Sequence, residues 1–119
     1  MKTEGKVGDC IFCKIVKGEI PCSKVYEDKD VLAFDDIHPA APVHVVIIPK
    51  QHIPTLMDVG DAQRASLNAV MASVPQIATI KGIDQRGFKF VINCKEGGGQ
   101  VVLHLHAHVL GGKKLRGVV

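Results

Sequence analysis

The stretch "VVLHLHAHVLGG", residues 101–112, places His104, His106 and His108 at every second position. In an extended strand, side chains two residues apart point to the same face. The residues that alternate with these histidines are apolar, so the pattern predicts a strand with one buried face and one face lined by imidazoles. A merely solvated polar face is the alternative, and three histidines in strict alternation argue against it.

One metal ion cannot bind all three histidines of such a strand. Each step of two residues rises about 6.6 Å, which would put His104 and His108 roughly 13 Å apart. Metal–nitrogen bonds are about 2 Å long, so neighbours in the row can share an ion but its two ends cannot. The row must therefore be divided between different tasks.

The rest of the chain predicts an α+β fold. A short helix is expected from about residue 11 to residue 17, with Asp9 as its N-cap and Gly18 at its end. A long helix is expected within residues 58–82, with a kink or a restart at Pro75. Strands are expected in "KVYED", "VLAFDD", "VHVVIIP", "FKFVIN" and the histidine segment. We therefore expect a five-stranded antiparallel sheet that the long helix covers on one face.

Size and composition limit what this fold can be. With 119 residues, of which 46% are hydrophobic, residues 1–119 are expected to form a single domain. The net charge is +3 and the basic residues are scattered in ones and twos, which predicts no nucleic-acid partner. No apolar run is long enough for a membrane span, so a cytoplasmic protein is expected. An exposed sheet edge favours a homodimer, in which two sheets join into one.

Cys10 and Cys13 lie one helical turn apart in "CIFC". Such a pair is a redox couple, half of a zinc site, or two core cysteines, and the zinc half-site is the interpretation we favour. His52 and one histidine of the row would complete a Cys₂His₂ set. Cys22 and Cys94 are interpreted as core or surface thiols, because a domain of this size needs no disulfides.

A glycine-rich loop, "CKEGGGQ", comes directly before the histidine row. Its backbone N–H groups, together with Asn93 and Gln100, can approach an anion closely, which predicts a phosphate site next to the imidazoles. A simple hairpin turn explains the glycines equally well when they are taken alone. Neutral imidazole is a competent nucleophile toward phosphorus, so the combination points to phosphate chemistry.

Three blocks of the sequence together carry a family resemblance. They are "CIFCKIVKGEIP", "VLAFDDIHPAAPVHVVIIPKQHI" and "GQVVLHLHAHVLGG", and they cover nearly the whole chain. In order and spacing they resemble the histidine triad family of nucleotide hydrolases and transferases, with its H-x-H-x-H signature. Within that family, the chain is most similar to the Hint-type nucleoside phosphoramidases.

The resemblance implies a role for each site residue. His106 would be the nucleophile that attacks the α-phosphorus, with a backbone carbonyl holding its other ring nitrogen, and His108 would assist at the phosphate oxygens. Asp36 would bind the ribose, and zinc would be held by Cys10, Cys13, His52 and His104. His44 would support the triad or be a plain strand residue, and His38 would be exposed. The remaining nucleotide contacts would come from Ile11, Phe12, Ile20, Phe34, Ile37, Asn93, Gly99, Gln100 and Val101.

The chain departs from the family pattern in three respects. Lys95 stands where the loop N-x-G-x-x-x-G-Q usually has its first glycine, and Val101 stands where the Hint branch commonly has a serine. The chain also has no tryptophan, whereas that branch often ends with a tryptophan-containing tail. The resemblance implies hydrolysis of purine nucleoside 5′-phosphoramidates or related adenylated compounds. A diadenosine polyphosphate hydrolase and a non-catalytic nucleotide- or zinc-binding scaffold are the alternatives.

Overall fold

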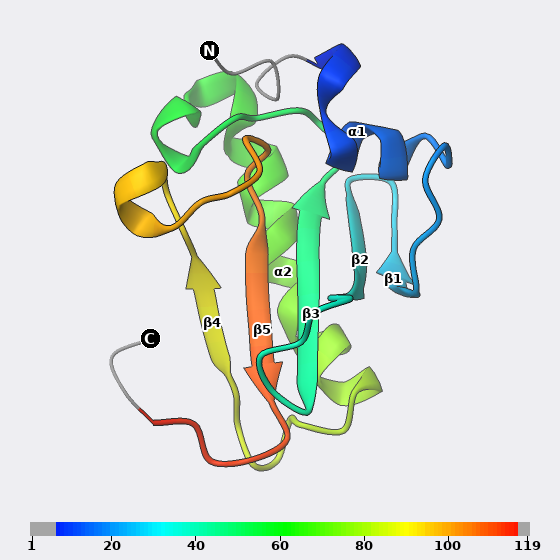
Figure 1. Ribbon diagram of the computed structural model, residues 1–119, viewed down its shortest axis with the longest axis vertical. Coiled ribbons are helices and arrows are strands. Elements are labelled where there is room, and N and C mark those ends of the chain that lie inside the picture. Colours follow the sequence, from blue (N-terminus) through cyan, green and yellow to red (C-terminus); the bar gives the residue numbers. More distant parts are fainter. Residues whose placement is uncertain (1–6, 117–119) are drawn as a thin grey trace.

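A computed structural model describes residues 7–116 of the chain. Five strands form one antiparallel sheet in the spatial order β1-β2-β3-β5-β4 (Figure 1). The α+β architecture and the five-stranded antiparallel sheet predicted from the sequence are confirmed. The strands are β1 (Lys24–Glu27), β2 (Val31–Asp35), β3 (Val43–Pro49), β4 (Lys89–Ile92) and β5 (Ala107–Gly111).

The two α-helices lie on opposite faces of the sheet (Figure 1). The long helix α2 (Arg64–Ile80) runs through Pro75 without interruption, so the restart that the proline suggested does not occur. Its inward side chains, Val70 and Ile77, lie on either side of the proline and are fully buried, and this packing holds the helix together across the missing donor. Between residues 7 and 116, the 3₁₀ turns are η2 (Val7–Asp9), η3 (Leu56–Asp58), η4 (Asp61–Gln63) and η5 (Glu96–Gly98).

The short helix α1 (Ile11–Val16) has a different N-cap from the one predicted. Asp9 ends the preceding 3₁₀ turn, and Cys10 is the N-cap, with its Sγ accepting the backbone N–H of Cys13 at 3.3 Å. The prediction of Asp9 was wrong because a buried sulfur takes the role that is usually filled by an oxygen acceptor. The start of α1 therefore fixes both cysteines relative to each other.

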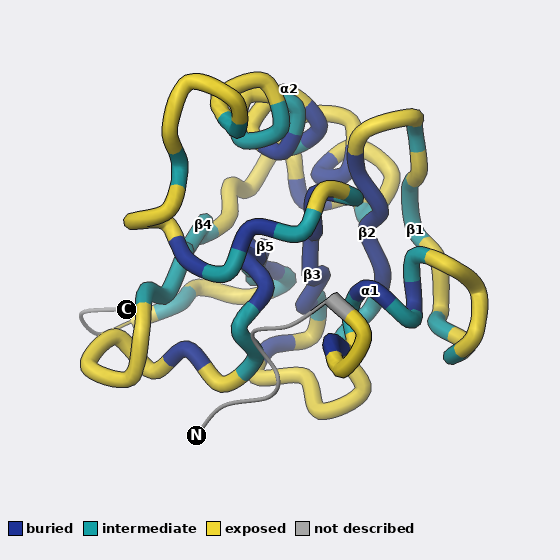
Figure 2. The backbone as a smooth tube through the Cα atoms, turned by 90° about the horizontal axis from the view of Figure 1, so that it is seen from above, coloured by how far each residue is buried: buried dark blue, intermediate teal, exposed yellow. Residues whose placement is uncertain are grey.

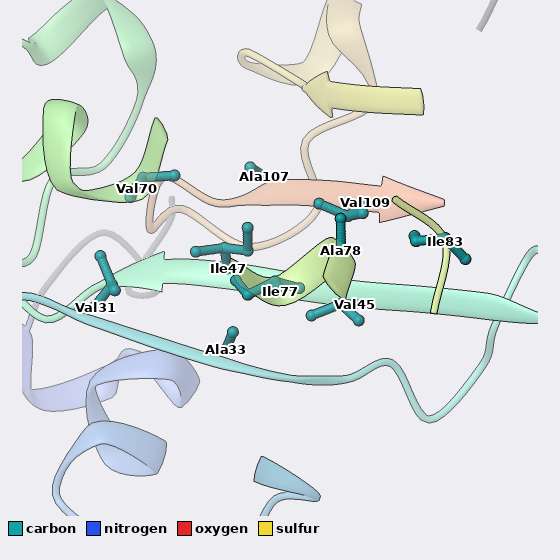
Figure 3. Close-up of a cluster of buried hydrophobic side chains, with 10 residues drawn as sticks. All are labelled: Val31, Ala33, Val45, Ile47, Val70, Ile77, Ala78, Ile83, Ala107 and Val109. Carbon is teal, nitrogen blue, oxygen red and sulfur yellow. The ribbon is translucent and has the colours of Figure 1, made fainter. Parts of the chain in front are cut away.

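Alternation along the central strands divides the core into two layers. In β2 and β3 the odd-numbered residues, such as Val31 and Val45, pack against α2, as Figure 3 shows for the larger cluster. The even-numbered residues, such as Leu32 and Val46, pack on the other face with Ile15 of α1. These strands are buried on both faces, as the dark tube of β2 and β3 in Figure 2 shows, which explains their nearly continuous apolar sequence.

The histidine segment is only partly a strand. β5 begins at Ala107, so His108 lies in it while His104 and His106 precede it, and the prediction of one strand through all three was wrong. The reason is a competing set of contacts: Leu105 donates its N–H to the Ile53 carbonyl at 2.6 Å, and the His104 ring bonds the Pro49 carbonyl. The segment before β5 thus bonds to the residues at and after the end of β3 and does not extend the strand pairing of β3 with β5.

Two further predictions concern the chain as a whole. All four cysteines are free thiols, as a core of this size allows. Within the described part of the chain, no helix combines the length and the apolar character that a membrane crossing requires.

Candidate active site

The three histidines of the row lie in three different environments. His104 is fully buried and faces Cys10, Cys13 and His52. The ring of His106 packs edge-on against Phe12 at a centroid distance of 5.0 Å. His108 lies in β5 next to His44, after the bend that precedes this strand. The division of the row between tasks stays a prediction.

The four predicted metal ligands lie together. Their ligand atoms are all within 4.8 Å of one another. His104 Nδ1 is 3.3 Å from Cys10 Sγ, and His52 Nδ1 is 3.2 Å from Cys13 Sγ. The two Nδ1 atoms are 3.2 Å apart. Ligands on a zinc tetrahedron are separated by about 3.3–3.8 Å, so these residues fit a single tetrahedral metal ion.

The protonation of this cluster also fits a metal. His104 Nε2–H donates to the Pro49 carbonyl at 2.8 Å, which leaves the Nδ1 lone pair pointing at the cluster. Burial lowers the pKa of His104 to about 4, so its ring is neutral at pH 7. Burial, followed by the neighbouring Cys10, raises the pKa of the Cys13 thiol to about 11. A bound cation is what converts such thiols into thiolate ligands.

The contacts of His106 give it the tautomer and the charge that a nucleophilic imidazole needs. Its Nδ1 lies 2.8 Å from the His104 carbonyl oxygen. A carbonyl can only accept, so Nδ1 carries the proton and Nε2 keeps its lone pair. Burial lowers the pKa of His106 below its usual value, which keeps the ring neutral at pH 7. The backbone carbonyl implied by the resemblance is thus that of His104.

His108 has the opposite tautomer, and His44 sets it. The backbone N–H of Ala40 donates to His44 Nδ1 at 3.0 Å, so the proton of the neutral His44 ring is on Nε2. His44 Nε2 lies 2.9 Å from His108 Nδ1, which must then accept, leaving His108 Nε2–H as a donor. The Asp36 carboxylate, 3.5 Å from His44 Nε2, is placed to favour this arrangement. Burial lowers the pKa of His108 to about 4, so it stays neutral.

These contacts predict an observable difference between the two histidines. In nitrogen-15 NMR spectra at neutral pH, His106 is expected as the Nδ1–H tautomer and His108 as the Nε2–H tautomer. In His44→Leu, His108 is expected to become a mixture of tautomers while His106 keeps its pattern. His44→Gln, which retains a donor near Nε2, serves as the matched variant. Identical tautomers for His106 and His108 in the wild type would contradict the assignment.

The glycine-rich loop is held by its own side chains. Gln100 is buried, its amide donates to the carbonyls of Pro54 and Val102, and its Oε1 accepts the Lys95 N–H. Asn93 donates to the Gly98 carbonyl at 2.8 Å. Gly99 has a positive φ of 85°. In this state Asn93 and Gln100 shape the loop, and their contact with phosphate stays a prediction.

Lys95 adopts φ 61°, and it is the single non-glycine residue with a positive φ between residues 7 and 116. With ψ at −178°, this backbone conformation is close to glycine-only and costs about 1–3 kcal/mol for other residues. Lys95→Gly is expected to raise the free energy of unfolding by about 1 kcal/mol after the entropy cost of glycine. Urea unfolding measures the change. Lys95→Ala removes the charge and keeps the Cβ, so a gain in that control as well would exclude backbone strain as the cause.

The predicted nucleotide-binding residues are only partly gathered. Phe12 and Phe34 are in edge-to-face contact at 5.8 Å, and Ile20 packs in the same cluster. Ile11 and Ile37 are exposed, Ile37 by 85%, and neither belongs to that cluster. The Asp36 carboxylate is half-buried and accepts the His38 N–H at 2.8 Å, while His38 itself is exposed as predicted. Val101 is 80% exposed next to the loop.

Sequence reasoning left one site residue undecided, and that was His44. Register gives the signal: Val46 pairs with His108 and His44 with Leu110, so the two histidines lie diagonally on one face of neighbouring strands. Without knowledge of the β3–β5 pairing, the contact cannot be seen in the sequence, because the two histidines are 64 positions apart.

Comparison with known proteins agrees with this site. The HIT domain pattern matches residues 17–115. The chain belongs to the histidine triad (HIT) family. It is 47% identical to protein HitA of Neisseria gonorrhoeae, with 87% of this chain and 95% of that protein covered. It is 42% identical to the purine nucleoside phosphoramidase of Escherichia coli K12, over 90% of each chain.

Solved HIT structures share the fold. A HIT family hydrolase from Legionella pneumophila superposes with a TM-score of 0.86 at 46% identity, covering 90% of this chain and 96% of that one. The chain is therefore an enzyme, a nucleotide hydrolase of the HIT family. Cys10 and Cys13 precede the matched residues, so half of the metal cluster comes from outside the HIT pattern.

Proposed function

We propose that this HIT enzyme hydrolyses purine nucleoside 5′-phosphoramidates and related adenylated compounds through a nucleotidyl intermediate on His106. The observation that carries the proposal is the His106–His104 hydrogen bond, which leaves a neutral Nε2 lone pair available for attack. The identity to a purine nucleoside phosphoramidase supports the substrate class. Phe12 and Phe34, together with Ile20, would hold the base, and Asp36 would hold the ribose.

The chemistry has two steps. In the first, His106 Nε2 forms a bond to the α-phosphorus and the phosphorus–nitrogen bond of the substrate breaks. The bond's electron pair stays with the leaving amine, which takes a proton from water. In the second, water attacks the phosphorus, the His106–phosphorus bond breaks, and its electron pair returns to Nε2 as the water gives up a proton. The His104 carbonyl would stabilise the imidazolium intermediate, and His108 Nε2–H would donate to a phosphate oxygen.

The metal cluster has a structural role in this proposal. Zinc is the metal that the Cys₂His₂ donor set favours, and Cys10, Cys13, His52 and His104 would hold it. It would fix the position of His104, whose carbonyl orients the nucleophile. The cluster supports this interpretation of the cysteine pair over a redox couple, because two histidines complete the ligand set. A reducing compartment such as the cytoplasm would keep the thiols available, and that localisation remains a prediction.

A homodimer is also part of the proposal. The sheet has two outer strands, β1 and β4, and pairing of one edge with a second copy would give a continuous sheet. Light scattering at micromolar concentration measures the assembly, with twice the chain mass as the expected result.

A direct assay tests the activity. With adenosine 5′-phosphoramidate, the protein is expected to release adenosine monophosphate and ammonia, and in ¹⁸O-water one labelled oxygen enters the nucleotide. A diadenosine polyphosphate added to the same assay as a competing substrate shows which of the two compounds the enzyme prefers, and so tests the alternative of a diadenosine polyphosphate hydrolase. Binding of adenosine monophosphate without turnover of either compound would replace the hydrolase by a non-catalytic scaffold.

A further inference from the structure

A cavity of about 580 Å³ opens next to His108 and His44 on the sheet face away from α2. Its walls come from β4, β5 and the segment that follows β5, which turns back past the start of β4 (Figure 1). It lies on the β4 side of His108, whereas Phe12 and Phe34 lie on the α1 and β2 side. A nucleotide with its base near Phe12 and its phosphate at His108 would therefore direct its leaving group into this cavity.

The cavity combines an apolar floor with a cationic rim. Val91 and Leu110 contribute to the floor, and the charged side chains are Lys89, Lys113, Lys114 and Arg116. Among the residues that the structure describes, no aspartate or glutamate lines it. Within residues 7–116, none of these four cations takes part in an ion pair. The fold thus gathers four of the fifteen lysines and arginines around one site, and their charges are available to a ligand.

The segment that follows β5 is fixed in position where it begins, at Gly112. Gly112 has φ +92°, and a Cβ there would lie 2.9 Å from a side-chain atom of Pro42. Arg86 also donates to the Gly112 carbonyl at 3.4 Å. Packing against the start of β3 therefore fixes the turn at Gly112, and this turn places Lys113 and Lys114 next to the cavity.

We propose that this cavity is a leaving-group site with a preference for anionic groups, either carboxylate or phosphate. The proposal rests on the proposed function, and it adds that the leaving group of the preferred substrate is negatively charged. Amines that carry a carboxylate or phosphate would be cleaved from the nucleotide more efficiently than neutral or cationic amines of the same size.

A matched pair of substrates tests the preference. The adenosine 5′-phosphoramidates of β-alanine and of β-alaninamide differ only in carboxylate against carboxamide. The two amines differ in basicity, so the ratio of their kcat/KM values is compared between wild type and variants rather than taken alone. Lys89→Gln is expected to lower the ratio of β-alanine to β-alaninamide turnover by about two- to fivefold. Lys114→Gln is expected to act in the same direction.

Lys29→Gln is the matched control. Lys29 is exposed in the β1–β2 turn, so this substitution removes the same charge at a place away from the cavity. Its ratio is expected to equal that of the wild type. Raising the salt concentration from about 0.05 M to 0.5 M is expected to lower the wild-type ratio, since screening weakens contacts to exposed cations. Diadenosine triphosphate, compared with the β-alanine compound in the same variants, separates phosphate from carboxylate preference.

A ratio unchanged by Lys89→Gln, Lys114→Gln and salt overturns the anionic preference, while turnover of β-alaninamide phosphoramidate still supports the hydrolase. If neither compound is hydrolysed, the proposed hydrolase function fails, whatever the charge preference of the cavity. Calorimetric binding of the two compounds then tests the cavity, and equal dissociation constants in wild type and Lys89→Gln overturn it.

Discussion

His106→Ala is expected to lower kcat for adenosine 5′-phosphoramidate by about 10⁴-fold or more. The variant removes the only protein atom that forms a bond to phosphorus in the proposed mechanism, and the neighbouring rings cannot replace it. His108 Nδ1 is occupied by His44, and the His104 lone pair points into the metal cluster. The KM is expected to change little, because base and ribose contacts lie elsewhere. Steady-state kinetics with release of adenosine monophosphate measures both quantities.

Two variants make this result specific. His38→Ala removes an exposed imidazole and keeps the backbone N–H that Asp36 accepts, so its turnover is expected to match the wild type. His106→Gly leaves room for a small nucleophile, so added imidazole is expected to restore part of the activity. Turnover of His106→Ala within tenfold of the wild type would remove His106 from the role of nucleophile, even if binding of the nucleotide were intact.

The sequence predicted the fold where local patterns and packing agree. The apolar alternation of β2 and β3 is directly visible in "VLAFDD" and "VHVVIIP", and both strands are buried on two faces as such runs predict. The Cys/His cluster was predictable as well, because a cysteine pair that binds zinc needs two further ligands. His52 and His104 lie close enough to the Cys13 sulfur to fill these places.

The error at Asp9 is local, because the Cys10 sulfur caps α1, but the error in the histidine row comes from tertiary contacts that local patterns do not contain. The alternation at His104 and His106 has the period of a strand, but hydrogen bonds to Pro49 and Ile53 take that segment out of the sheet. The cationic cavity was invisible for a related reason. Lys89 is more than twenty positions from Lys113, and only the β4–β5 pairing brings their segments together. Charge counted along the sequence therefore understated the basic character of this face.

Cys13→Ser is expected to lower the melting temperature by roughly 10 °C or more and to remove most of the bound zinc. A ligand present at about 1,000 times its Kd contributes about 4 kcal/mol to the free energy of unfolding. For a domain of this size, each kcal/mol corresponds to about 3–5 °C. Serine keeps the size of the side chain but is a poor zinc ligand at pH 7. Elemental analysis of protein purified without chelator, together with thermal unfolding, measures the effect.

Cys94→Ser is the matched control, because Cys94 is a half-buried thiol outside the cluster. Its zinc content and melting temperature are expected to stay close to those of the wild type. Trace zinc in the wild type, or equal melting temperatures for the Cys13→Ser and Cys94→Ser variants, would contradict a structural zinc site.

The Cys13→Ser variant also tests whether the metal only stabilises the fold or in addition positions the nucleophile His106. His104 contributes its ring to the cluster and its carbonyl to His106 Nδ1, so losing the metal releases the group that fixes the nucleophile's tautomer. At a temperature where Cys13→Ser is fully folded, kcat is therefore expected to fall by about 10- to 100-fold, the range found when groups that orient a site are lost. Full activity of the folded, zinc-free variant would show that the hydrogen bonds to the Pro49 and Ile53 carbonyls hold the backbone around His104 without a metal.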